Sequence, residues 1–128
     1  MAKGIGLHEN RTRVVFHLPL GDTKEEQAAN KVLKFLKSQH EDDSGVKGFT
    51  HSAFRPAVFR GWWWSDPADD WCDDPIVLVF VDYRIDFGDL RLSQKIKELK
   101  KTIRYWYRYF GKPQEEIWVV AHQVMRFD

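Results

Sequence analysis

Two histidines and one aspartate could supply acid–base or metal chemistry if the fold brings them together. His17 and His122 lie in segments with strand-like alternation near opposite ends of the chain. If these strands are neighbours, both imidazoles can share one sheet face. Asp82 interrupts an apolar run, so it needs a cationic partner, either Arg84 or an arginine of the second predicted helix. These three residues form one candidate site, and the alternative is two hydrogen-bonded histidines beside a structural ion pair.

Four tryptophans, three of them consecutive, form a second candidate site: Trp62, Trp63, Trp64 and Trp71. Three consecutive residues of an extended chain cannot all point to the same side, so at least one indole should be partly exposed. Tryptophan is enriched at interface hot spots, which favours an anchor for a ligand or partner. The alternative is a lid that packs on the domain's own sheet.

Five aspartates surround the last tryptophan: Asp66, Asp69, Asp70, Asp73 and Asp74. Their carboxylates could bind a hard cation, but the spacing matches no EF-hand loop and lacks its glycine and closing glutamate. The pattern predicts a solvated acidic loop without a metal. The chain also has no nucleotide or thiol redox motif that would indicate a cofactor.

The second predicted helix carries a basic face with tyrosines beside it. Such a face could bind phosphates and stack bases, and it could equally be a solvated surface. The residues concerned are Lys97, Lys101, Arg104, Arg108, Tyr105 and Tyr109.

Two amphipathic helices are predicted. Asp22 and Glu25 resemble a capping box, and the apolar residues after them recur at helical spacing to about Gln39. The second helix begins after Asp89 and ends at Gly111, and its apolar residues fall within an arc of about 80°. This stripe consists of Leu92, Ile96, Leu99, Ile103, Trp106 and Phe110.

Four strands are predicted from alternation and apolar runs. The third is apolar on both faces except for Asp82, which is typical of a central strand covered on both sides. The second is interrupted around Pro56, and residues 66–75, with two prolines and five aspartates, are predicted to form a loop. The predicted strands span residues 13–20, 49–64, 76–83 and 117–124.

The order strand, helix, strand, strand, helix, strand corresponds to the ferredoxin-like βαββαβ arrangement of the α+β class. It predicts a four-stranded antiparallel sheet with both helices on one face and a Trp- and Asp-rich segment between the second and third strands. Residues 1–128 are expected to form a single domain, with 1–12 as a flexible arm. Because the third strand needs two covering layers, either the Trp-rich segment or a second copy should cover the open face.

RNA-recognition domains share this element order, and the run Phe80-Val81-Asp82-Tyr83 is similar to the end of their RNP1 motif. The preceding residues depart from that motif, since Val77 and Val79 stand where it has glycine or another small residue. The similarity covers a few residues and does not identify the chain as a member of the family.

Composition narrows the classes of partner. The net charge is +1, which argues against bulk nucleic acid, although residues 65–86 hold seven aspartates and one arginine, and residues 87–112 hold eight basic and two acidic residues. The single cysteine, Cys72, favours the cytoplasm. The longest apolar run is too short for a membrane segment.

The leading hypothesis is a non-enzymatic cytoplasmic module that binds a protein partner, a small ligand or a second copy of itself, as a homodimer, through its open sheet face and its tryptophans. One alternative is a nucleic-acid-binding module that uses the basic face of the second helix. Another is a small enzyme or ligand-binding domain built on His17, His122 and Asp82.

Overall fold

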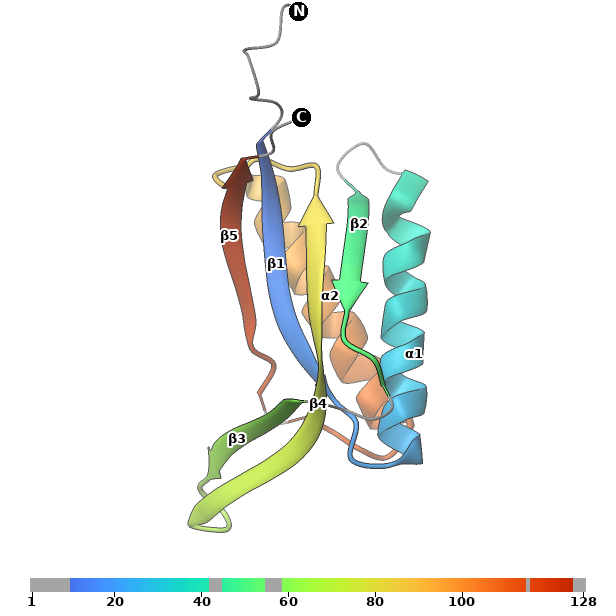
Figure 1. Ribbon diagram of the computed structural model, residues 1–128, viewed down its shortest axis with the longest axis vertical. Coiled ribbons are helices and arrows are strands. Elements are labelled where there is room, and N and C mark those ends of the chain that lie inside the picture. Colours follow the sequence, from blue (N-terminus) through green and yellow to red (C-terminus); the bar gives the residue numbers. More distant parts are fainter. Residues whose placement is uncertain (1–9, 42–44, 55–58, 115, 126–128) are drawn as a thin grey trace, which may run out of the picture.

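The structure is a computed structural model that describes residues 10–41, 45–54, 59–114 and 116–125. These residues form an α+β arrangement of two helices and a five-stranded antiparallel sheet (Figure 1). Most of the expected N-terminal arm, residues 1–9, lies outside the described residues, whereas residues 10–12 already belong to the first strand. No helix in the described part of the chain is long and apolar enough to cross a membrane.

The sheet has the strand order β2-β4-β1-β5, with β3 also paired to β4. Ile76 of β4 pairs with Pro19 on one side and with Phe59 of β3 on the other, so β3 lies on the same edge of β4 as β2. The strands are β1 (Asn10–Pro19), β2 (Val46–His51), β3 (Phe59–Ser65), β4 (Asp70–Tyr83) and β5 (Val119–Met125).

The two predicted helices are confirmed as α1 (Thr23–Ser38), followed by a short 3-10 helix (Gln39–Glu41), and α2 (Leu90–Tyr109). Asp22 caps α1 by accepting a hydrogen bond from the Glu25 amide at 2.8 Å, and the Glu25 carboxylate accepts one from the Gly21 amide at 2.7 Å. Gly111 ends the turn after α2 with a φ of 77°, a conformation in which glycine is favoured.

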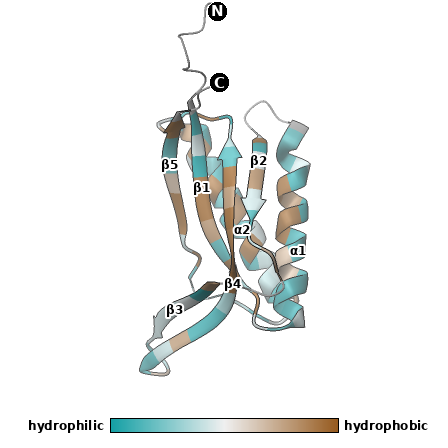
Figure 2. Ribbon diagram, in the orientation of Figure 1, coloured by the Kyte–Doolittle hydropathy of each residue, from teal (hydrophilic) through white to brown (hydrophobic). Residues whose placement is uncertain are grey.

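Both helices pack on one face of the sheet. The buried residues of β1 and β4 alternate along each strand and join those of α1 and α2 in one core. Figure 2 shows the hydrophobic residues gathered on this sheet and on the inner side of α1. The strand residues concerned are Val14, Phe16, Leu18, Val77, Val79 and Val81.

The apolar stripe of α2 faces this core. Leu92, Leu99 and Ile103 are buried, while the other three predicted residues are partly buried against the core. Tyr107, which the predicted stripe omits, is fully buried, and its hydroxyl donates a hydrogen bond of 2.8 Å to the carbonyl of Pro19. That bond satisfies the one polar atom of the side chain.

The predicted number of four strands is wrong. The predicted strand 49–64 forms two strands, β2 and β3, on either side of the interruption expected near Pro56, a residue outside the described part of the chain. The predicted loop 66–75 is also wrong after residue 69, because Asp70–Pro75 extends β4 and pairs with β3. Cross-strand pairing here outweighs the low β-propensity of aspartate and proline.

Candidate functional site

The β3–β4 hairpin extends beyond the end of the four central strands (Figure 1). It closes through residues 66–69, where the Asp69 amide donates to the Asp66 carbonyl at 3.2 Å and the Ala68 amide to the Ser65 hydroxyl at 3.4 Å. Pro67 suits the second position of such a turn, and Asp69 adopts a φ of 50°, which aspartate tolerates better than most residues.

The hairpin separates the consecutive tryptophans by strand alternation. Trp64 pairs with Trp71, and Trp62 pairs with Asp73, so these three tryptophans share one face of the hairpin while Trp63 lies on the other. The exposed fractions are 62% for Trp62, 41% for Trp63, 47% for Trp64 and 59% for Trp71. All four are therefore available to a partner, and Trp64 and Trp71 meet edge to face at 5.8 Å.

Acidic side chains border these tryptophans. Asp73 binds Arg60 of β3, with 2.6 Å between the carboxylate and Nε. Asp66, Asp69 and Asp70 at the tip are exposed, and none of the three forms an ion pair with another described residue. Within the part of the chain that the structure describes, no group of three or more His, Cys, Asp or Glu could hold a metal.

The sheet face opposite the helices carries His17, His122 and Asp82. Asp82 forms a two-point ion pair with Arg13 of β1, at 2.9 Å to Nε and 3.2 Å to the terminal nitrogen. The partner expected from the sequence, Arg84 or an arginine of α2, is thus incorrect. The Arg13 guanidinium also lies 5.9 Å from the ring centre of Phe80.

The two histidines and Asp82 are not in one cluster. Arg13 pairs in register with Asp82 on one side and His122 on the other, which puts those two roughly 10 Å apart at the usual strand spacing. His17 lies four residues farther along β1, about 13 Å from Arg13. His17 is exposed on this face of the sheet. The surrounding atoms still desolvate its imidazole in part, and this lowers its pKa.

The basic residues predicted on α2 are all exposed, and the tyrosines beside them are 56% and 66% exposed. Tyr105 and Tyr109 stack at 6.3 Å between ring centres. None of Lys97, Lys101, Arg104 and Arg108 forms an ion pair with a described residue.

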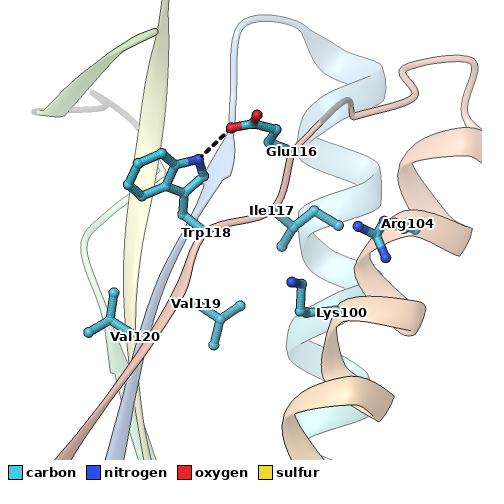
Figure 3. A pocket seen from close by; sticks show the side chains of 7 residues that line it. All are labelled: Lys100, Arg104, Glu116, Ile117, Trp118, Val119 and Val120. Carbon is cyan, nitrogen blue, oxygen red and sulfur yellow. Dashed lines mark hydrogen bonds between the residues drawn. The ribbon is translucent and has the colours of Figure 1, made fainter.

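A shallow open groove of about 370 Å³ runs between α2 and β5 (Figure 3). Lys100 and Arg104 line it from α2, and residues 116–120 line it from the other side. Trp118 is 65% exposed, and its indole nitrogen donates to Glu116 at 2.9 Å. Trp118 is not among the site residues predicted from the sequence. Its alternation with Val120 nevertheless indicates that both side chains point to the outer face of the sheet.

A second open groove of about 680 Å³ lies between α1 and β2. His51 lines it between two aromatic rings, at 6.3 Å from Phe49 and 5.4 Å from Phe54. Its Nδ1 lies 2.8 Å from the carbonyl of Ser52, so the imidazole is anchored to the backbone.

Carboxyl groups converge where the base of the hairpin meets the start of α1. Burial, followed by the charge of Asp74, raises the pKa of Glu25, and burial, followed by the charge of Asp73, raises the pKa of Asp74. Lys112 forms an ion pair with Asp22 at 2.5 Å, and this contact lowers the pKa of the Asp22 carboxyl. The sequence showed only the capping role of Glu25, because its proximity to Asp74 depends on the course of β4.

Comparisons with known proteins give no family. No family model matches the chain, and no curated protein matches it. Among solved structures, the chain is similar to a phage SAM lyase in complex with S-methyl-5'-thioadenosine, with a TM-score of 0.49 and 13% identity over 100% of this chain and 95% of that one. At this identity and TM-score, the likeness carries no information on activity.

Proposed function

We propose that this chain is a ferredoxin-like, non-enzymatic cytoplasmic module that self-associates as a homodimer through its β3–β4 hairpin and its open sheet face. The ferredoxin-like assignment is supported by the order β2-β4-β1-β5 with a helix after β1 and another after β4. In this assignment, β3 and the first part of β4 are an extension of the four-stranded unit.

The observation that carries the proposal is the exposure of the hairpin tryptophans. Trp62, Trp64 and Trp71 lie on one face of a two-stranded ribbon, and each is at least 47% exposed. A contiguous exposed aromatic patch of this kind is typical of an interaction surface. The open face of the sheet adds Trp118 and Val120, which are 65% and 47% exposed.

Nucleic-acid binding through α2 is the second candidate, because the four basic side chains predicted for that face and the two tyrosines beside them are exposed. The enzyme hypothesis has weaker support, since Asp82 is already bound by Arg13 and the two histidines lie apart along the sheet.

Light scattering at micromolar concentration tests the proposal. We expect the mass of two chains for the native protein and of one chain after Trp62→Ala, Trp64→Ala and Trp71→Ala are combined, because these substitutions remove the aromatic anchors. The matched control is Phe87→Ala, an exposed aromatic in the loop before α2, which should remain dimeric. A native protein with the mass of one chain contradicts the proposal.

A further inference from the structure

The hairpin and the outer side of α2 are opposite in charge, and each carries exposed aromatic side chains. Residues 59–75 contain five aspartates and one arginine, and that arginine is bound by Asp73. Leu90–Tyr109 contains seven basic residues and one acidic residue. The chain therefore presents an acidic aromatic surface and a basic aromatic surface, both exposed.

The basic side of α2 continues into the groove shared with β5. At 100° per residue, five basic side chains fall within an arc of about 100° on the helix. We call them the basic strip: Lys97, Lys100, Lys101, Arg104 and Arg108. Lys100 and Arg104 line the groove from α2, and Ile117 and Val119 add apolar surface (Figure 3). Its one carboxylate, Glu116, is held by Trp118.

The walls of this groove are thus both cationic and apolar, and the hairpin offers the complementary chemistry. Its tip has three exposed aspartates without an ion pair among the described residues, next to exposed indoles. Carboxylates can bind Lys and Arg, and an indole can lie against aliphatic side chains or over a guanidinium.

The hairpin does not occupy the groove of its own chain. Its two strands, β3 and the first part of β4, pair with each other, it projects beyond the sheet and away from α2 (Figure 1), and its tryptophans are exposed. A contact between the hairpin and such a groove therefore requires a second molecule.

We infer that the β3–β4 hairpin of one copy docks on the basic strip and the α2–β5 groove of a second copy. This inference rests on the proposed self-association and names the surface that receives the hairpin, a groove whose lining includes Trp118 and Val120 of the open sheet face. Each copy has one β3–β4 hairpin and one α2–β5 groove, so two copies can exchange hairpins about a two-fold axis and satisfy both contacts. Complementary charge then sets the orientation and the association rate, while the buried indoles supply the affinity.

Charge reversal with complementation tests this arrangement. One variant carries Asp66→Lys and Asp70→Lys in the hairpin, and the other carries Lys101→Glu and Arg104→Glu in α2. All four positions are exposed, so both variants should keep the native circular dichroism spectrum. Each variant alone would place like charges in both contacts, and we expect its dimer to dissociate at least about tenfold more readily.

Mixing the two variants should restore the dimer. In the mixed pair, the reversed hairpin faces the reversed helix and the native hairpin faces the native helix, so both contacts are again complementary. Native mass spectrometry distinguishes this heterodimer from either homodimer by mass. The control variant is Lys24→Glu with Lys34→Glu, two exposed lysines of α1, which should dimerise like the native protein.

The outcomes separate the two proposals. If the native protein dimerises but the charge variants dimerise equally well, or if their mixture gives no heterodimer, the hairpin-to-α2 contact is wrong while self-association stands. If the native protein has the mass of one chain, both proposals fail. If only the α2 variant changes behaviour, through loss of nucleic-acid binding, the basic strip serves a polyanion and the inference is overturned.

Discussion

The contacts of individual side chains in this protein depend on which segments distant in sequence the fold brings together. Asp82 and Arg13 are 69 residues apart in the chain and meet because β1 and β4 pair in one particular register. A single sequence offers several nearby arginines for Asp82, and only the sheet selects among them. Tyr107 also meets a distant partner, but through the packing of α2 on the sheet, and its hydroxyl donates to a carbonyl 88 residues away.

At the residue scale, Glu25 gives a pH-dependent prediction. Burial raises the pKa of Glu25 and of its neighbour Asp74, so the folded protein retains these protons to a higher pH than the unfolded chain does. The stability that they contribute is therefore present at low pH and is lost as the pH rises through the raised values. Lys112 opposes this trend, because its positive charge lowers both pKa values.

Glu25→Gln should flatten this dependence, since the amide cannot ionise and its oxygen can still accept from the Gly21 amide. We expect the free energy of unfolding to fall less between about pH 4 and about pH 7 in the variant than in the native protein. Urea titrations across this range measure the difference, with Glu98→Gln as the control for the loss of an exposed glutamate. A curve with the same slope as the native protein contradicts the assigned role.

At the element scale, α2 was the element that the sequence predicted most completely. The sequence placed its apolar residues in one arc, its start after Asp89 and its end at Gly111, and all three features recur in the structure, where Asp89 also caps the helix. The hairpin was the least predictable element, because Pro67, Pro75 and the aspartates are typical of loops. Pairing between β3 and β4 depends on both strands at once, which a pattern within either strand does not reveal.

The core-facing side of α2 yields a stability prediction. Leu99→Ala removes a fully buried side chain and should cost about 2–5 kcal/mol. Leu90→Ala is the matched control, because this leucine of the same helix is 82% exposed and should change stability by less than about 0.5 kcal/mol. Chemical denaturation of both variants measures the contrast, and equal losses would contradict the packing of the helix.

At the scale of the whole molecule, the sequence predicted both helices on one face of the sheet, and the structure has one core between the helices and that face. The alternation did not say which face this is, because the third predicted strand is apolar on both. The sequence did not decide whether a lid from the same chain or a second copy covers the other face. The tryptophans of the hairpin are exposed, so they do not form a closed lid over that face. The light-scattering and mass-spectrometry experiments above test whether a second copy covers it.

The 14-residue strand β4 belongs to two environments at once. From Ile76 to Tyr83 it has β1 on one side and, over most of that length, β2 on the other, whereas from Asp70 to Pro75 the structure gives it β3 as its one paired neighbour. The free energy of local opening depends on how much buried structure must be exposed. Amide hydrogen exchange should therefore differ between the two halves of this strand. We expect Val77, Val79 and Val81 to exchange with the slow rates of global unfolding and Trp71 to Asp74 to exchange far faster in the isolated chain. If the proposed dimer forms, raising the protein concentration should slow exchange in the hairpin half of β4 alone. One strand would then report both folding and association.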